Sequence, residues 1–457
     1  MRIGARKPRK KLRAILVLVV ITLLAVGGWL GLRVGPDPEI MLSTEYPAVG
    51  RATTVTALFS EPRNGLGEIR LELIQGDRVE VLAEEVFEPG SPLPWSGDRG
   101  TADAALSSSV GSEVFDWLAE GEVTLRATAG VGSGFLRRTP PVVEETILPV
   151  RLRPPRLEVV SSQHYVRQGG AGAVVYSVGE TAVSSGVRAG AHVSIGSPVD
   201  GGGPDERFAI YALPWNLDDV GEVRLFAEDD AGNRVERSFV DLFKARPPRR
   251  DTIRISDGFL ERVVPAIASR TPGFDDAGSL LEQYVEINAN LRRAELERVV
   301  ELSKLSEPAF LWSGPFLQMA NSARMAGFAE TRSYVYDGRE VDRQTHLGLD
   351  LASTAHAPVP APNAGRVLFA GWMTLYGNAV IIDHGYGLLS VSGHLSAIDV
   401  AEGEAVERGH IIGSSGATGL AGGDHLHLEI FVHGQSVDPV EWLDAHWIEN
   451  NITSKLQ

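Results

Sequence analysis

The chain has 457 residues, too many for one ordinary hydrophobic core, and this length predicts about three domains. Hydrophobic residues make up 43% and charged residues 22%, as in globular proteins, and the formal net charge of −16 argues against a nucleic-acid partner, because an acidic surface repels phosphate. The chain has no cysteine, which excludes disulfides and thiolate metal sites, so a bound metal must be held by histidine and carboxylate side chains.

The N-terminal segment has the pattern of a membrane anchor. Residues 1–13 contain seven Lys and Arg residues and predict a cytoplasmic tail, and residues 14–35 predict a transmembrane helix. We therefore expect a single-pass protein of the cell (inner) membrane, with the bulk of the chain in the periplasm or extracytoplasmic space. A cleaved signal peptide is the alternative, with Ala25-Val26-Gly27 as the small-residue cleavage site.

The next two hundred residues predict two β-sandwich domains, at 38–152 and 156–245. Short runs of alternating apolar residues are bounded by Gly, Pro and Asp, which is typical of antiparallel strands. The sequence GEVTLRA at 121–127 returns as GEVRLFA at 221–227, and in each copy Val, Leu and Ala are expected to face a core. The second copy resembles a late hairpin of bacterial immunoglobulin-like domains. One larger β domain is the alternative. We expect envelope proteins as partners of this region.

A helical linker is expected between these domains and the C-terminal region. Arg246-Pro247-Pro248-Arg249-Arg250 has the paired prolines and charges of a solvated connection. Residues 251–308 predict short helices, because Ser279 and Glu282 fit a capping box and apolar residues follow at helical spacing. One hypothesis is that these helices shield a downstream active site until a partner moves them.

Residues 310–450 predict a domain of antiparallel β structure that holds the strongest chemical signal. In His346-Leu-Gly-Leu-Asp350, a strand turns the His and the Asp to the same face, and Gly348 leaves the space between them empty. Such a pair can converge on one metal ion. The class of the whole chain is therefore expected to be mainly β and multidomain.

Three further histidines belong to the same region. In His425-Leu-His427 both imidazoles share one strand face, and His394 follows another strand-like run. Catalytic zinc commonly has three protein ligands and a water, and peptide hydrolysis also needs a base for that water and a donor for the oxyanion. Histidines that do not bind the metal can supply both.

The segment from about 310 to 448 resembles the lysostaphin-like (LytM-type) zinc metallopeptidases, which cut peptide bonds in peptidoglycan stems or cross-bridges. The resemblance rests on His346–Asp350, Gly377-Asn378, Asp383-His384-Gly385, Gly393–Ser396, and Gly416–Gly419 leading to His425–Glu429. It implies Zn²⁺ as cofactor, with His346, Asp350 and His427 as ligands. It also implies His394 and His425 as the catalytic pair, which orients or deprotonates the water and stabilises the oxyanion.

The segment departs from the family pattern at two positions. Ser392 stands where the family usually has a tyrosine, so substrate fit or rate is expected to differ, and Leu428 replaces a frequent phenylalanine. Three other polar residues carry no assigned catalytic role: His384 is expected to be structural, Glu429 to support His427 or form a salt bridge, and Arg332 has no role.

Together these features predict a membrane-anchored zinc metalloendopeptidase that acts on peptidoglycan peptides. A biotinyl or lipoyl carrier is excluded because no lysine for cofactor attachment occurs between Lys304 and Lys455. A cell-wall scaffold or amidase activator, which uses a peptidase-like domain for binding, is the alternative. The presence of all five site residues favours the enzyme.

Overall fold

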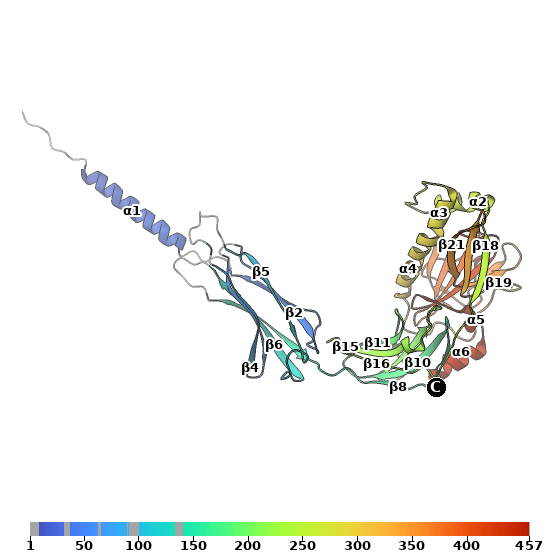
Figure 1. The fold of residues 1–457 in the computed structure, drawn as a ribbon, viewed down its shortest axis with the longest axis horizontal. Coiled ribbons are helices and arrows are strands. Elements are labelled where there is room, and N and C mark those ends of the chain that lie inside the picture. Colours follow the sequence, from blue (N-terminus) through green and yellow to red (C-terminus); the bar gives the residue numbers. More distant parts are fainter. Residues whose placement is uncertain are drawn as a thin grey trace, which may run out of the picture. The chain divides into compact units, whose positions relative to one another are not determined.

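The structure is a computed structural model, and it describes residues 9–31, 37–62, 65–88, 90, 100–132 and 140–456 (Figure 1). The chain divides into two compact units, Met1–Pro154 with Asp229–Asn233, and Pro155–Glu228 with Arg234–Gln457. Strands predominate in both units, so the mainly β prediction is confirmed. Residues 1–8 of the predicted basic tail and 32–35 of the predicted anchor lie outside the described residues.

One helix, α1 (Arg9–Gly31), forms where the anchor was predicted. Across the part of the chain that the structure describes, no helix is both long and apolar enough to cross a membrane.

The first unit contains two antiparallel sheets that share one hydrophobic core. The sheet orders are β1-β2-β5 and β4-β3-β6-β7, and the core draws on both, as in a sandwich. The prediction that this sandwich is immunoglobulin-like is not confirmed. The strands are β1 (Glu39–Thr44), β2 (Thr53–Ser60), β3 (Leu66–Gln75), β4 (Arg78–Val86), β5 (Asp103–Val110), β6 (Gly121–Val131) and β7 (Val142–Val150).

The second β region, from β8 to β17, has two sheets of four strands each, β13-β14-β10-β8 and β12-β11-β15-β16. It also contains a parallel pair of β17 and β9. The repeated heptapeptide lies on β6 in the first unit and at the start of β15 here, and its Val, Leu and Ala are buried in both copies, as predicted. The elements are β8 (Leu157–Val159), β9 (Tyr165–Arg167), β10 (Ala171–Val178), β11 (Ala182–Ala189), β12 (His192–Ile195), β13 (Ser197–Pro198), β14 (Glu206–Ala212), η1 (Val220–Glu222), β15 (Val223–Asp229), β16 (Arg234–Arg237) and β17 (Leu242–Lys244).

The segment predicted as a linker and helices is part of a folded layer. Residues 249 and 250, predicted as linker, begin strand β18 (Arg249–Arg254), which pairs in parallel with β20 (Glu330–Tyr336); β20 pairs with β21 (Arg339–His346). The predicted capping box of Ser279 and Glu282 is confirmed. The helical elements are α2 (Asp257–Ala268), α3 (Leu280–Glu286), the π-helical turn η2 (Ile287–Leu291) and α4 (Arg292–Ser303).

The C-terminal region is built on a large antiparallel sheet of order β19-β22-β30-β26-β25-β24-β28, with β31 paired to β30. Its strands are β19 (Ala323–Ala326), β22 (Leu349–Ala352), β24 (Gly365–Met373), β25 (Gly377–Asp383), β26 (Leu388–Leu395), β28 (Ala405–Val406), β30 (Leu426–Val432) and β31 (Gln435–Val437). A smaller sheet contains β23 (Pro358–Pro360), β29 (Ile411–Ser414) and β27 (Ala397–Ile398), and the chain continues through α5 (Pro439–Trp442), α6 (Ala445–Asn451) and η3 (Thr453–Leu456).

Strand β10 joins the second β region to the C-terminal region, because it is buried on both faces. Successive side chains of a strand point to opposite sides. Val174 and Tyr176 lie in the core of the second β region, whereas Ala173 and Val175 lie in a core shared with the C-terminal region. That shared core includes Trp442 of α5. The two predicted domains are therefore packed around common apolar residues.

Candidate metal centre

Three strands bring His346, Asp350 and His427 together. Asp350 on β22 and His427 on β30 are direct partners in an antiparallel ladder, so their side chains share one face of the sheet. His346 is the last residue of β21, where it pairs with Glu330 of a different sheet. The expectation of one continuous strand from 346 to 350 was wrong, since the chain bends at residues 347 and 348 before β22 begins.

Gly348 makes this bend compatible with the cluster. A Cβ atom at this position would lie 2.6 Å from Cε1 of His427 and 2.8 Å from the carbonyl oxygen of Leu428. Real Cβ atoms do not approach other atoms so closely, so a side chain here would displace the His427 ring. Gly348 was expected to leave an empty space between His346 and Asp350, whereas in the structure the His427 ring occupies the space that the missing side chain leaves.

The three side chains place one atom each in a small triangle. His346 Nε2 lies 3.0 Å from Asp350 Oδ1 and 3.2 Å from His427 Nδ1, and the third side, from His427 Nδ1 to Asp350 Oδ1, is 2.9 Å. A tetrahedral ion with bonds of about 2.0–2.1 Å separates its ligand atoms by about 3.3 Å. The triangle is therefore close to the size that such an ion needs, and these residues could hold a metal.

Hydrogen bonds on the far side of each ring leave the correct nitrogen for a metal. His346 Nδ1 lies 2.9 Å from the carbonyl oxygen of Gly327, which can only accept, so Nδ1 carries the proton and Nε2 presents its lone pair to the cluster. In His427 the roles are reversed: Nε2 lies 3.1 Å from Glu429 Oε2, and Nδ1 faces the cluster. Such orienting partners are typical of histidines that bind metals.

Glu429 is the buried centre of a network behind His427. Its Oε2 also accepts a hydrogen bond of 2.7 Å from the Tyr376 hydroxyl, and its Oε1 accepts one of 2.5 Å from Ser436 Oγ. The sequence identified Glu429 as a candidate support for His427, and the contact is present. Tyr376 and Ser436 were missed: Tyr376 directly precedes the Gly377-Asn378 motif, but nothing in the sequence connects Ser436 to this network.

Arg332 holds the second oxygen of Asp350. Its Nη2 donates a 2.9 Å hydrogen bond to Asp350 Oδ2, which leaves Oδ1 for the cluster. Arg332, for which no role was expected, therefore orients the carboxylate of Asp350. Burial acts to raise the pKa of Asp350, but the contacts of its carboxyl group with the rings of His346, His425 and His427 outweigh this effect, so the pKa lies well below its ordinary value and the side chain is a carboxylate.

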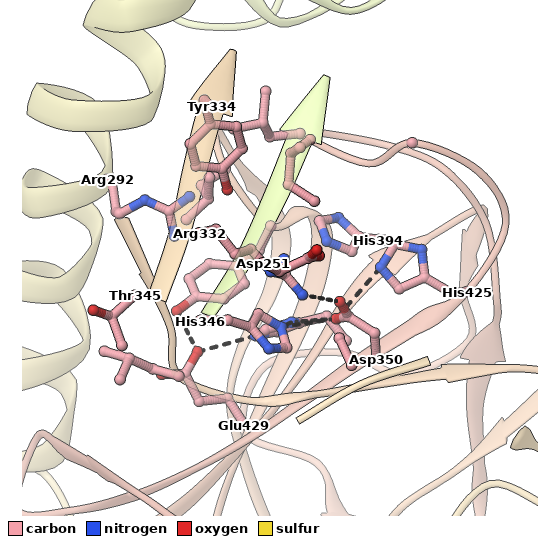
Figure 2. A pocket seen from close by; sticks show the side chains of 18 of the residues that line it. Asp251, Arg292, Arg332, Tyr334, Thr345, His346, Asp350, His394, His425 and Glu429 are labelled. Carbon is pink, nitrogen blue, oxygen red and sulfur yellow. Dashed lines mark hydrogen bonds and ion pairs between the residues drawn. The ribbon is translucent and has the colours of Figure 1, made fainter. Parts of the chain in front are cut away.

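His394 and His425 lie beside the cluster with their ring centroids 4.8 Å apart (Figure 2). His394 Nδ1 donates to the carbonyl oxygen of Thr418 and His425 Nδ1 donates to that of Gly423, each over 2.8 Å, so both rings keep Nε2 for other contacts. His425 Nε2 lies 3.5 Å from Asp350 Oδ1. Burial, followed by the charges of His425 and His427, holds the pKa of His394 well below its ordinary value, so its ring is neutral.

The cluster opens onto a cavity of about 330 Å³. The three metal-cluster residues, His394 and His425 line one part of it, whereas Phe259 of α2, Tyr284 of α3, and Arg292 and Leu296 of α4 line another. The segment 251–308 therefore contributes a wall of the site rather than only connecting two domains.

The geometry agrees with a match in the sequence: residues 344–439 match the model of Peptidase family M23. This segment is a Peptidase family M23 domain. The DD-carboxypeptidase/endopeptidase Mpg of Neisseria meningitidis is 44% identical over 95 residues, which are 21% of this chain and 22% of that protein. The murein hydrolase activator EnvC of Escherichia coli is 34% identical over 96 residues, 21% of this chain and 23% of EnvC. The chain thus matches less than a quarter of the length of either relative.

A solved structure also matches part of this chain. The catalytic domain of lysostaphin from Staphylococcus simulans is 27% identical to this chain, with a TM-score of 0.25, and the match covers 29% of this chain and 98% of that domain. The predicted resemblance to lysostaphin-like peptidases is confirmed by the family match.

The remaining expectations for the M23 domain concern residues outside the cluster. Buried His384 contacts the carbonyl oxygen of Ala364 at 2.7 Å and Ser390 Oγ at 2.8 Å, so it is structural, as predicted. Ser392 is buried on β26 opposite Leu428 of β30, and neither residue lines the cavity. The two departures from the family pattern are thus direct partners across neighbouring strands, and the expected effect of Ser392 on substrate fit or rate stays a prediction.

Proposed function

We propose that the chain is a zinc metalloendopeptidase that hydrolyses peptide bonds in peptidoglycan stem or cross-bridge peptides. The observation that carries this proposal is the triangle of His346 Nε2, Asp350 Oδ1 and His427 Nδ1, whose sides are 2.9–3.2 Å. The M23 match and the activity in the name of the Neisseria relative support the same reaction class.

His346, Asp350 and His427 would hold the metal, because the chain has no cysteine and two imidazoles with one carboxylate suit zinc. When bound, zinc polarises the substrate carbonyl and lowers the pKa of water. The carboxylate state of Asp350 favours this binding, and its bond from Arg332 keeps Oδ1 directed at the cluster.

His394 and His425 would carry the proton and oxyanion chemistry. Neutral His394 presents Nε2 with a lone pair, because its Nδ1–H is donated to Thr418, and such a nitrogen can take a proton from the attacking water. His425 lies beside His394, and in its doubly protonated form, with Nδ1–H donated to Gly423, it can donate Nε2–H to the oxygen that becomes negative in the tetrahedral intermediate. A hydrogen bond to a carbonyl oxygen fixes the orientation of each ring, so neither ring has to reorient during the reaction.

The proposed substrate places the catalytic region outside the cytoplasm, in the periplasm or extracytoplasmic space. The two β regions then provide surfaces for envelope proteins. The second of them shares a core with the M23 domain, so a partner bound there would contact the same folded unit as the site.

The test is zinc content together with release of peptides from purified peptidoglycan by the full chain. We expect the wild-type chain to bind about one zinc ion and to release peptides. Both His427→Ala and His394→Ala should lose peptide release, but only His427→Ala should also lose zinc. His410→Ala, outside the cavity, is the matched control and should retain both. Release that survives His427→Ala, or release by zinc-free protein, would refute the mechanism. If the zinc-loaded protein releases no peptide and instead activates a cell-wall amidase, the scaffold alternative would be supported. The name of EnvC, a murein hydrolase activator, is the reason to test this alternative.

A further inference from the structure

The guanidinium group of Arg292 also lines the cavity beside the metal cluster. This residue is the first of helix α4, and its side chain points from that helix toward the cavity, across from His346 and Asp350 (Figure 2). The mechanism proposed above gives it no role. It is also outside residues 344–439, so the match to the M23 family does not account for it.

The local fold holds Arg292 in a single position. The π-helical turn η2 precedes it, and such turns are frequent at functional sites. Asn288 in this turn is fully buried, and its Nδ2 donates to Asp342 Oδ2 over 2.6 Å. Arg292 Nε then donates to the Asn288 carbonyl oxygen over 3.0 Å, and Nη2 donates to Asn288 Oδ1 over 2.6 Å. Two hydrogen bonds to one anchored residue fix the plane of the guanidinium.

The other charges that line the cavity differ from Arg292 in their partners. Arg332 is paired with Asp350 and Glu330, and Glu429 is held by His427, Tyr376 and Ser436. Among the described residues, no carboxylate oxygen lies within 4.0 Å of a guanidinium nitrogen of Arg292. Exposed Asp251 also lines the cavity, on strand β18, and its Oδ1 accepts the N–H of Thr252. Arg292 is thus a half-buried cation that Asn288 orients and that has no carboxylate in direct contact among the described residues, although its charge is felt by buried Glu295.

We infer that Arg292 is a substrate-binding residue that receives a free carboxylate of the peptide being cut. A guanidinium presents donors in a planar fork that matches a carboxylate, and a partly dehydrated cavity strengthens the contact. The substrate class is then a peptide with an ionised carboxyl group near the scissile bond, as opposed to one in which that group is amidated or absent. This inference rests on the proposed peptidase function and adds a determinant of specificity supplied by the helical segment.

The test uses synthetic stem peptides in which each free carboxylate in turn is converted to a carboxamide. For the full wild-type chain, one of these conversions is expected to lower kcat/KM by about 10- to 100-fold, mainly through KM, because a hydrogen bond to a charged group has that value. Arg292→Gln should show a similar loss with the unmodified peptide and little further loss with the amidated one. Arg292→Lys keeps the charge and should fall between them.

Arg293→Gln is the matched control, because Arg293 is the next residue of α4, is exposed, and bonds to Asn290 instead. It should behave as wild type, and thermal melting should show that all variants are folded. If the loss of kcat/KM caused by Arg292→Gln and the loss caused by amidation multiply when the two changes are combined, the inference would be overturned. So would faster cleavage of all peptides by Arg292→Gln, which would indicate that the helices shield the site.

A binding measurement separates this inference from the proposed function. Isothermal titration of the same peptides into the full chain should show a similar loss of affinity for the amidated peptide or for Arg292→Gln. If wild type cleaves neither peptides nor peptidoglycan but shows this binding pattern, the peptidase proposal fails and the carboxylate site stands. If it cleaves all peptides equally well and binds them equally well, the carboxylate site fails and the peptidase proposal stands.

Discussion

Asp350 and His427 are direct partners across strands β22 and β30, and Asp350 Oδ1 lies 2.9 Å from His427 Nδ1. The hydrogen-bond register of the sheet therefore sets the distance between these two candidate ligands. A slip of one residue would turn one of them to the opposite face. The third, His346, comes from another sheet and reaches them only because the chain bends at Gly348.

Gly348→Ala should impair metal binding without unfolding the chain. The added Cβ would lie 2.6 Å from Cε1 of His427, so the ring must move away from the triangle. We expect zinc affinity to fall by about 10- to 100-fold, which is the usual cost of losing the orientation of a ligand. Competition with a chelator measures the affinity. Gly258→Ala, where the new Cβ would contact nothing within 4 Å, should leave it unchanged.

Glu429→Gln should weaken zinc binding through His427. The carboxylate accepts from His427 Nε2, Tyr376 and Ser436, and it makes the His427 ring a stronger electron donor. We expect an affinity about tenfold or more below wild type, with a smaller loss in Ser436→Ala, which leaves the contact to His427 in place. Equal zinc affinity in wild type and Glu429→Gln would show that the carboxylate serves packing alone.

Phe208→Ala should destabilise the M23 domain, although Phe208 lies on β14 of the second β region. Its ring packs edge-on against Tyr386 at 5.1 Å between centroids, inside the shared core. A buried Phe→Ala change costs about 3–5 kcal/mol of unfolding free energy. Denaturant unfolding of the chain, followed by fluorescence and by zinc release, should show one common shift. Val183→Ala, at an exposed position, is the control.

Truncation at residue 251 should fail for the same reason. A fragment from 251 to 457 lacks β10 and β14, and it exposes Trp442, Phe316 and Ile430, which are buried against them. We expect this fragment to aggregate or to unfold without a cooperative transition, whereas residues 155–457 should melt cooperatively. A soluble and cooperative 251–457 fragment would show that the shared core is dispensable.

Glu295→Gln should change how stability depends on pH. Glu295 of α4 is buried and accepts the Leu375 N–H over 2.8 Å; burial raises its pKa to about 7, against the opposing effect of this bond. Between the ordinary value of 4.5 and about 7, the folded state holds a proton that the unfolded state has released. The contribution of Glu295 is therefore fully present below pH 4.5 and is lost as pH rises to 7.

The glutamine variant cannot titrate, so its unfolding free energy relative to wild type should rise as pH increases from 4.5 to 7 and then level off. Denaturant unfolding at several pH values measures this difference. Glu297→Gln, at an exposed position of the same helix, should run parallel to wild type. If the difference in unfolding free energy between wild type and Glu295→Gln is constant from pH 4.5 to 7, Glu295 does not have the raised pKa assigned to it.

The local patterns of the sequence predicted much of the site and less of its surroundings. Alternating residues predicted the buried faces of β6 and β15, because the geometry of a single strand is specified by neighbouring residues. The family resemblance, and not strand geometry, implied which side chains meet at the cluster, because the strand expected from 346 to 350 is interrupted at residues 347 and 348. The family resemblance predicted the fold of the M23 segment.

Contacts between distant segments could not be predicted in this way. Arg332 bonds to Asp350 only because β20 and β22 belong to sheets that approach each other, and Arg292 reaches the cavity through a π-helical turn that has no clear sequence signal. The shared core was missed because β10 was assigned to a separate sandwich. A strand buried on both faces has a continuous apolar run, and Ala171–Val178 does show one, so this signal was available.

The position of β10 has a consequence for how the molecule is made. Protein synthesis begins at the N-terminus, and Ala171 meets Glu441 across a separation of 270 residues. One apolar surface of β10 is therefore exposed until α5 has been synthesised. The second β region cannot reach its final state during elongation, so premature termination anywhere before α5 should leave a nascent chain that requires a chaperone to stay soluble.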